Sequence, residues 1–184
     1  MSHSNDFNKD NIETYLLDFA EEYDKLIEEK QPLKIILVGG ASVVLNYNFR
    51  NSTNDIDYSN PYTDFIEIAI LKTAEKNKLF KDWLNNEIRK TNSYSDKIND
   101  ISIFYKNISD VLEVRTISSE YLIAMKLMAF REHKHDLSDI AGILMENKEK
   151  GKPLKKQDID NAVISLYGDI NKLSKEAIIM INNT

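Results

Sequence analysis

The stretch from residue 35 to residue 58 constrains the fold more than any other part of the 184-residue chain. It begins with the apolar run Ile35–Val38, which is short and rich in β-branched side chains and therefore predicts a buried strand. Gly39 and Gly40 end the run, and glycine lets backbone amides approach another group closely. An apolar segment with helical spacing follows at residues 41–47. We therefore expect a strand, a glycine turn and a short helix, an arrangement that offers helix-terminal amides to a phosphate.

Two aspartates follow this helix in the order Asp55-Ile56-Asp57-Tyr58. The period-two geometry of a strand directs Asp55 and Asp57 to one face of a sheet, with their side chains about 6–7 Å apart. At an effective dielectric constant of about 20, two carboxylates at that separation repel each other by roughly 2–3 kcal/mol. A hard divalent cation such as Mg²⁺ or Mn²⁺ relieves this repulsion and also binds phosphate oxygens. The pair predicts a metal–nucleotide site, and the alternative is a solvated turn with both carboxylates exposed.

Composition narrows the class of protein. A chain of 184 residues is expected to form one domain with a helical appendage. The sequence contains no cysteine, which excludes disulfides and thiolate metal sites. Its 30 acidic and 24 basic side chains give a net charge of −6, which argues against broad electrostatic adhesion to nucleic acid. The polar first residues do not resemble a signal peptide and no apolar run has the length of a membrane span, so we expect a cytoplasmic protein with no membrane partner.

Hydrophobic periodicity predicts the remaining elements. We expect strands at residues 101–105 and 111–117, a short helix or turn with Trp83 as a packed anchor at residues 81–88, and helices from residue 10 to before Pro32 and over residues 62–79, 121–132, 136–147, 154–167 and 171–182. Ser118 is expected to cap the helix that follows it, and Phe65, Met128 and Leu137 are expected to face inward. The predicted fold class is α/β (α+β), with a small mixed sheet of about four strands flanked by helices. We expect an α/β core in residues 1–117 and a helical C-terminal half in residues 118–184, packed on the core as one compact unit.

The strand ending in Gly-Gly, the short helix and the pattern Arg-x-x-Thr-x-Asp-x-Asp resemble the nucleotidyltransferase superfamily, that of DNA polymerase β. More narrowly, they are similar to the bacterial AbiE-type abortive-infection toxins and related domains. The residues that match are Gly39, Gly40, Arg50, Thr53, Asp55 and Asp57. A second block at residues 126–140 is similar to the Lys-x-x-Ala and Asp-x-x-Asp motifs of these toxins, with Lys126, Asp136 and Asp139 at the matching positions.

The resemblance implies an enzyme that transfers a nucleoside monophosphate from an NTP to an acceptor hydroxyl or phosphate. Asp55 and Asp57 would hold Mg²⁺ or Mn²⁺, Lys126 would stabilise the leaving pyrophosphate, and Asp139 or Asp136 would complete the pocket. The nucleotide-binding residues that it implies are Gly39, Gly40, Ser42, Arg50, Thr53 and Asp139. The implied acceptor is tRNA or protein, which would make the chain the toxin of a toxin–antitoxin pair with a cognate antitoxin.

Several of these positions have other interpretations. Arg50 contacts phosphate, pairs with the aspartates, or is an ordinary surface arginine. Lys126, on a largely apolar helix, meets phosphate or extends to water, in which case Arg131 and the aspartates of the second block form a structural ion-pair network. Glu113 is the candidate for a third metal ligand, although it lies in no strong motif. The weak third carboxylate favours another class of function, a catalytically inactive nucleotidyltransferase-like module that binds nucleotide or a partner protein.

Overall fold

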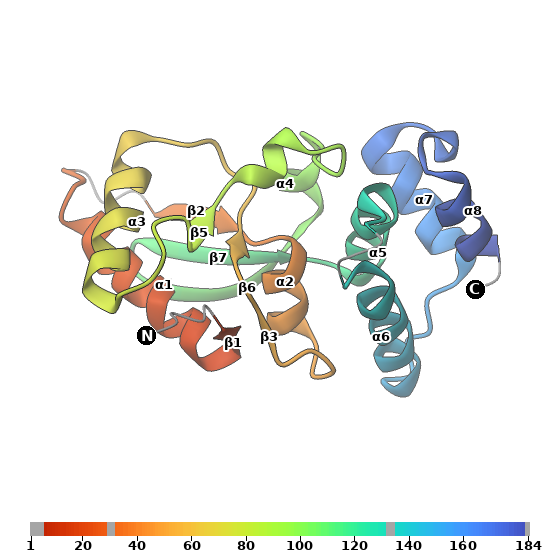
Figure 1. The fold of residues 1–184 in the computed structure, drawn as a ribbon, viewed down its shortest axis with the longest axis horizontal. Helices are drawn as coiled ribbons and strands as arrows, with labels where there is room; N and C mark the ends of the chain where they lie inside the picture. Colours follow the sequence, from red (N-terminus) through yellow and green to blue (C-terminus); the bar gives the residue numbers. More distant parts are fainter. Residues whose placement is uncertain (1–5, 29–31, 132–134, 183–184) are drawn as a thin grey trace.

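The computed structural model describes residues 6–28, 32–131 and 135–182. They form an α/β half followed by a helical half, which lie side by side (Figure 1). The elements of the α/β half are β1 (Phe7–Asn8), α1 (Lys9–Asp24), β2 (Leu33–Ile36), α2 (Gly39–Asn46), β3 (Ser52–Thr53), β4 (Ile56–Asp57), α3 (Asp64–Asn77), β5 (Leu84–Asn85), the 3-10 helix η1 (Glu87–Lys90), α4 (Ile98–Ile101), β6 (Ser102–Ser109) and β7 (Leu112–Ile117). Those of the helical half are α5 (Ser119–Ala129), α6 (Asp136–Glu149), α7 (Lys156–Tyr167), η2 (Ile170–Lys172) and α8 (Lys175–Asn182). Within the described ranges, none of the helices has both the length and the apolar character needed to cross a membrane.

The sheet has β7 at its centre, with β2 parallel to it on one side and β6 antiparallel on the other. Strands β4 and β5 pair with each other in parallel, so that Asp57 lies opposite Asn85. The two groups of strands meet where the chain continues past β2 and β4. An antiparallel bridge joins Leu37 to Tyr58 there, and the Val38 amide donates to the Asp57 carbonyl at 2.9 Å. The expected α/β fold with a small mixed sheet and a helical C-terminal half is confirmed.

The run Ile35–Val38 separates two hydrophobic cores. Ile35 and Leu37 pack into the core of the α/β half, whereas Ile36 and Val38 pack into the core that contains α5–α8. All four side chains are buried. Because both faces of this strand are covered, its sequence is continuously apolar instead of alternating between apolar and polar residues.

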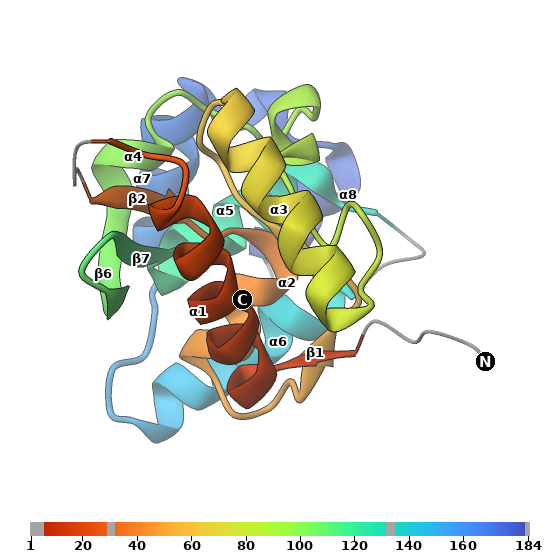
Figure 2. The ribbon, with the colours of Figure 1, turned by 90° about the vertical axis from the view of Figure 1, so that its left-hand side faces the viewer.

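Helices α1 and α3 lie against each other over the sheet of the α/β half (Figure 2). Trp83, which precedes β5, is 1% exposed in the core beneath them. Its Nε1 donates to the Ile70 carbonyl of α3 at 3.2 Å, and its ring contacts the rings of Phe7 and Tyr15. Trp83 therefore joins the chain before β5 to both helices, as expected of a packed anchor.

Two predictions about helix faces are wrong. Phe65 is 49% exposed because it lies one residue before the buried Ile66, which places it about 100° further round α3. Leu137 is 51% exposed because buried aspartates, Asp136 and Asp139, occupy the inward positions at the start of α6. The third expectation holds in part, because Met128 is half-buried against the core of the helical half and also lines a cleft.

Three local predictions also need correction. The first helix ends at Asp24, several residues before Pro32. Residues 84–85 form a strand that pairs with β4, and only the following residues, Glu87–Lys90, are helical. Ser118 is the N-cap residue of α5, but its hydroxyl donates to Glu120 Oε1 at 2.8 Å instead of accepting a hydrogen bond from a helix amide.

Trp83 provides a test of this packing. Replacing Trp83 by Ala leaves a cavity beside Phe7 and Tyr15, so we expect the free energy of unfolding to fall by about 3–5 kcal/mol. The control is Phe104→Ala on β6, where the ring is 56% exposed and the expected change is less than about 0.5 kcal/mol. Urea denaturation followed by circular dichroism measures both. Equal effects of the two substitutions would contradict this assignment of the core.

Candidate functional site

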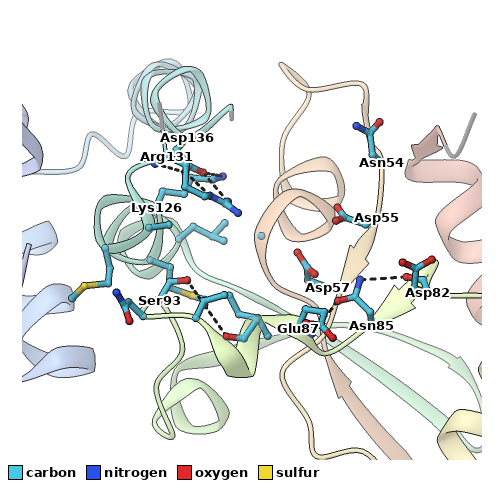
Figure 3. Close-up of a pocket in the computed structure, with 18 of the residues that line it drawn as sticks. Asn54, Asp55, Asp57, Asp82, Asn85, Glu87, Ser93, Lys126, Arg131 and Asp136 are labelled. Atoms are coloured by element: carbon cyan, nitrogen blue, oxygen red, sulfur yellow. Dashed lines mark hydrogen bonds and ion pairs between the residues drawn. The ribbon is translucent and has the colours of Figure 1, made fainter. Parts of the chain in front are cut away.

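A cleft of about 960 Å³ lies where the two halves meet. One wall, the sheet wall, consists of residues around β4 and β5, and the other, the helix wall, consists of residues from α5 and the start of α6. Figure 3 shows Asp55 and Asp57 on the sheet wall, opposite Lys126 and Arg131 on the helix wall. Between the walls runs a connection from β5 to α4 that we call the bridging segment (residues 87–97), several of whose residues line the cleft.

Asp55 and Asp57 lie on either side of Ile56 in the sheet wall. Both aspartates line the cleft, while Ile56 and the following Tyr58 are fully buried in the core of the α/β half. This is the alternation that strand geometry imposes on consecutive residues. Asp55 is exposed and Asp57 is half-buried, so the two carboxylates reach the same cleft from different depths.

Gly39 begins α2 directly beside Asp57. Its φ is +57°, in the left-handed region that residues with a side chain rarely adopt. A methyl group on Gly39 would also lie 3.2 Å from Asp57 Oδ2. The N-cap residue Val38 supplies no side-chain hydrogen bond to the first turn. The start of α2 thus brings the positive end of a helix dipole to the cleft next to a carboxylate.

The cleft face of α5 contains Leu122, Met125, Lys126 and Ala129. These positions have the i, i+3, i+4, i+7 spacing of a single helix face. The face is apolar except for Lys126, whose side chain is 7% exposed. A buried ammonium is costly without partners, so the groups around Lys126 determine what it can do.

Those partners are two aspartates of α6. Lys126 Nζ lies 2.6 Å from Asp139 Oδ2 and 3.4 Å from Asp136 Oδ1. The same Asp139 oxygen accepts a hydrogen bond from Arg50 Nη1 at 2.5 Å. Arg131 donates to Asp136 Oδ2 through its backbone amide and its Nε, both at 3.1 Å. We call these five residues the ion cluster, and its three cations and two anions leave one positive charge in excess.

Electrostatics link the ion cluster to the sheet wall. Burial alone raises the pKa of Asp136, but hydrogen bonds from Arg131 and the charge of Lys126 outweigh burial, so the pKa lies below its ordinary value. The hydrogen bonds from Arg131 to Asp136 raise the pKa of Arg131 despite partial burial, and the charges of Asp57 and Asp55 raise it further. The guanidinium of Arg131 therefore lies in the field of both sheet-wall aspartates.

Two of the predicted nucleotide-binding residues, Gly40 and Ser42, do not line the cleft. Ser42 is fully buried, and its Oγ accepts a hydrogen bond from the Ile117 amide at 3.0 Å. A methyl group on Gly40 would lie 2.3 Å from Thr53 Oγ1. The absent side chain at Gly40 thus makes room for Thr53, and the hydroxyl of Ser42 ties α2 to the end of β7. Ser42 is therefore not placed to contact a phosphate in the cleft, and Gly40 could do so only through its backbone amide in the first turn of α2.

Arg50, Thr53 and Asp139 also lie behind the cleft surface. Arg50 donates through Nε to the Ser52 carbonyl at 2.9 Å, and Thr53 is buried beside it. With Asp139 bonded to both Arg50 and Lys126, this group can hold Lys126 in place without touching a ligand. Of the two aspartates proposed to complete the pocket, Asp136 lines the cleft and Asp139 does not.

Glu113 is not brought to the cleft. It lies on β7, where Lys34 and Asn107 are its neighbours in register, and its Oε1 pairs with Arg115 Nη1 at 3.0 Å. β2 lies between β7 and β4. It pairs with β7 on one side, and on the other side Leu37, just after β2, forms a bridge with Tyr58, just after β4. The proposal of Glu113 as a third metal ligand therefore needs correction.

The strand beside β4 is β5, and polar residues in or next to this strand, which the sequence pattern had not indicated, line the cleft. Asp82, Asn85 and Glu87 line the sheet wall. The side-chain amide of Asn85 makes two hydrogen bonds to the backbone. Its Nδ2 donates to the Asp82 backbone carbonyl at 3.3 Å, and its Oδ1 accepts from the Glu87 backbone amide at 3.0 Å. The parallel partner of Asp57 is therefore an asparagine, with a glutamate two residues further on. Trp83-Leu84, an aromatic and an apolar residue before Asn85, is the signal that could have indicated a strand here.

The cleft is strongly acidic. Its lining includes six carboxylates, from Asp6, Asp55, Asp57, Asp82, Glu87 and Asp136, and two cationic groups, from Lys126 and Arg131. Among the residues described, no three His, Cys, Asp or Glu side chains lie close enough together to hold a metal ion. Asp55 and Asp57 offer the two carboxylates that Mg²⁺ commonly takes from a protein when substrate phosphates and water supply its other ligands.

The fold and the cleft define the class of the chain as a nucleotidyltransferase-like domain. It belongs to a family described as nucleotidyltransferase of unknown function (DUF6036), whose model matches residues 14–164. The match includes both walls of the cleft and the bridging segment. No curated protein and no solved structure matches the chain significantly. The resemblance is supported at the level of the nucleotidyltransferase-like domain, and the narrower AbiE-type relationship stays a prediction.

The pH dependence of stability tests the ion cluster. Because the pKa of Asp136 is lowered in the folded state, its ionised carboxylate stabilises the fold above the unfolded pKa of about 3.9, and this contribution is lost as the pH falls through the folded value. We expect Asp136→Asn to lower the free energy of unfolding by about 3 kcal/mol at pH 7. The difference from the wild type should shrink below about pH 4, where the wild-type carboxylate also becomes protonated.

Denaturant unfolding at several pH values between 7 and 3 measures this difference. Asp100→Asn, at an exposed carboxylate on α4, is the control and is expected to follow the wild type throughout. A gap between the wild type and Asp136→Asn that stays constant down to pH 3 would contradict a lowered pKa for Asp136.

Proposed function

We propose that this chain is a metal-dependent nucleotidyltransferase that transfers a nucleoside monophosphate from an NTP to an acceptor hydroxyl or phosphate. The observation that carries the proposal is the arrangement of Asp55 and Asp57 beside the start of α2, across the cleft from Lys126 and Arg131. Membership of a family described as nucleotidyltransferase supports the same class of reaction. A volume of about 960 Å³ is also adequate for a nucleotide.

The charges of the cleft favour a metal-dependent reaction. With six carboxylates and two cations in the lining, a triphosphate would enter a field of its own sign. A divalent cation held by Asp55 and Asp57, Mg²⁺ or Mn²⁺, would reverse that field locally and neutralise charge that develops on the phosphates in the transition state. The donor set fits such an ion, because hard cations prefer oxygen ligands and bind through one or two carboxylates with phosphate oxygens.

The protein groups opposite the aspartates suit the phosphates themselves. The start of α2 at Gly39 offers backbone amides and the positive end of the helix dipole. Lys126 offers an ammonium that Asp139 and Asp136 hold in position, and Arg131 offers a guanidinium that is 55% exposed. The single positive charge in excess in the ion cluster would stabilise pyrophosphate as it leaves.

The proposed reaction is a displacement at the α-phosphorus. The acceptor oxygen forms a bond to the α-phosphorus, and the bond from that phosphorus to the bridging oxygen of the β-phosphate breaks. Pyrophosphate leaves with the electron pair of that bond, and the proton of an acceptor hydroxyl passes to a carboxylate of the sheet wall. The chain's contribution is to align the two oxygens and to stabilise the developing charge.

The acceptor and the biological role follow from the resemblance to AbiE-type toxins alone. On that basis tRNA is the first acceptor to test and protein the second, with a cognate antitoxin as a partner. A catalytically inactive module that binds nucleotide or a partner protein is the second candidate function. The position of Glu113 favours it, because the third carboxylate expected of an active enzyme is paired with Arg115 away from the cleft.

Substitution of the aspartates tests the proposed function. We expect Asp55→Asn and Asp57→Asn each to lower the transfer rate by about 100-fold or more, because each removes a charge that holds the cation in the transition state. The assay follows the α-phosphate label of each NTP into cellular RNA and protein, with Mg²⁺ or Mn²⁺ and with a chelator. Asp110→Asn, at an exposed turn before β7, is the control and should retain wild-type activity.

Wild-type transfer that both substitutions leave unchanged would contradict the proposal. Calorimetry with NTP and Mg²⁺ separates the two candidate functions. Binding without transfer to any acceptor would favour the inactive module, whereas neither binding nor transfer would exclude both the enzyme and a nucleotide-binding module and leave only the protein-binding one.

A further inference from the structure

We propose that the apolar end of the cleft binds the nucleobase and that the side-chain amide of Asn92 determines which base is accepted. The proposal rests on the proposed function, since it assigns a place to the base of the NTP. It concerns the bridging segment and the first turns of α5, to which neither the resemblance nor the family description gives a role.

The cleft has two ends of different chemistry. At one end lie the charged groups, with Arg131 and Asp136 near the C-terminal end of α5 and the start of α6. At the other end the cleft face of α5 is apolar, with Leu122 and Met125 one to two turns before Ala129. Ile88 of η1 lines the same cleft from the bridging segment. A ligand with a polyanionic part and a flat apolar part matches this division, and an NTP has both.

Apolar side chains of this kind suit an aromatic ring. Methionine is unbranched and polarisable, so it adapts to a planar ring and makes favourable sulfur–aromatic contacts. Two methionines, Met125 and Met128, line the cleft next to Leu122. Such contacts would hold a base in place, but they would not distinguish one base from another, because every base has a π-face. Selection among bases requires a hydrogen-bonding group at the edge of the ring.

Most polar groups at this end are already paired. The hydroxyls of Thr91 and Ser93 lie 2.8 Å apart, and the Thr91 hydroxyl also donates to the Ile88 carbonyl at 2.8 Å. The Ser93 carbonyl accepts a hydrogen bond from the Tyr167 hydroxyl at 2.8 Å. These groups are occupied by contacts within the protein, so they are poor candidates for recognising a ligand.

Asn92 differs from its neighbours. Within residues 6–28, 32–131 and 135–182, its side-chain amide makes no hydrogen bond. The residue is exposed, and it lines both the main cleft and a second hollow of about 410 Å³, so other side chains do not cover it. An amide offers donors on nitrogen and an acceptor on oxygen, which is the combination that reads the edge of a base.

The segment that contains Asn92 is fixed on both sides. Arg89 donates to the Ser59 carbonyl at 2.8 Å, which anchors it to the α/β half. The Ser95 hydroxyl donates to the Leu166 carbonyl of α7 at 2.9 Å, which anchors it to the helical half. A side chain mounted between two anchors has little backbone entropy to lose when it binds, so its hydrogen bonds can discriminate between ligands.

The test measures the affinity of the full-length protein for each of ATP, GTP, CTP and UTP, and for inorganic triphosphate, by calorimetry with Mg²⁺. The variants are Asn92→Ala, which removes the amide, and Asn92→Asp, which keeps its shape but replaces the donor by an acceptor. Asn99→Ala, at an exposed position of α4 outside the cleft lining, is the matched control.

We expect the wild type to prefer one NTP by about 3- to 10-fold and to bind it more tightly than inorganic triphosphate, as one to two hydrogen bonds and an apolar contact imply. Asn92→Ala should lose this preference and leave triphosphate affinity within about twofold. Asn92→Asp should change the order of the four NTPs, because it cannot donate to the acceptor that the amide recognised. Asn99→Ala should match the wild type.

Four results would overturn the proposal. They are equal wild-type affinity for all four NTPs, wild-type NTP binding no tighter than that of inorganic triphosphate, an unchanged preference in Asn92→Ala, and an equal loss of triphosphate and NTP affinity in Asn92→Ala. In each case wild-type binding of NTP with Mg²⁺ would leave the proposed function intact. Absence of all NTP binding would instead overturn the proposed function, and the nucleobase site with it.

Discussion

The packing of Ile35–Val38 on both faces is the constraint on which the site depends. Burial of each of these side chains stabilises the fold by about 1.5–3 kcal/mol, and a shift of one residue in register would exchange the two cores that they fill. The strand is therefore held in one register. The backbone amide of Val38, at the end of this run, donates a hydrogen bond to the Asp57 carbonyl. The register of the strand therefore also fixes where Gly39 and the sheet-wall aspartates lie.

The ion cluster provides the second constraint, which acts between the two halves. Arg50 belongs to the loop before β3, whereas Lys126 and Asp139 belong to the helical half, so the shared carboxylate oxygen of Asp139 connects them. Buried ion pairs contribute little net stability, since desolvation offsets their attraction. Their effect here is to fix positions. Asp139 occupies an inward position of α6 where an apolar residue would be expected, whereas Leu137 points outward. The ammonium of Lys126 is thereby held at the cleft surface.

Local pattern predicted much of this structure. The apolar run at residues 35–38, the short helix after it and the helices of the C-terminal half have clear periodicity. All of them form, although the last α-helix begins at Lys175, after the separate 3-10 turn Ile170–Lys172, and not at residue 171. What the sequence could not indicate was non-local pairing. β5 is two residues long and gains its partner from β4, almost thirty residues earlier, so Asn85 and not Glu113 lies beside Asp57. For Ser42 and Gly40, the sequence pattern indicates that another group comes close, but it does not identify that group as a phosphate or as part of the protein. In the structure the Ser42 hydroxyl bonds to the Ile117 amide, and the Thr53 side chain lies against Gly40.

The bridging segment lets ligand selection vary separately from the charged groups of the cleft. Asp55, Asp57 and Lys126 are placed by the buried strand and the ion cluster, which tolerate few substitutions because their side chains are packed or paired. Ser93 and Tyr94 of this segment are packed, but Lys90, Thr91 and Asn92 have exposed side chains and lie between the anchors at Arg89 and Ser95. A change at such a position alters what the cleft recognises at little cost to stability. Selectivity in this fold is therefore free to change in a segment that the sheet wall and helix wall do not constrain.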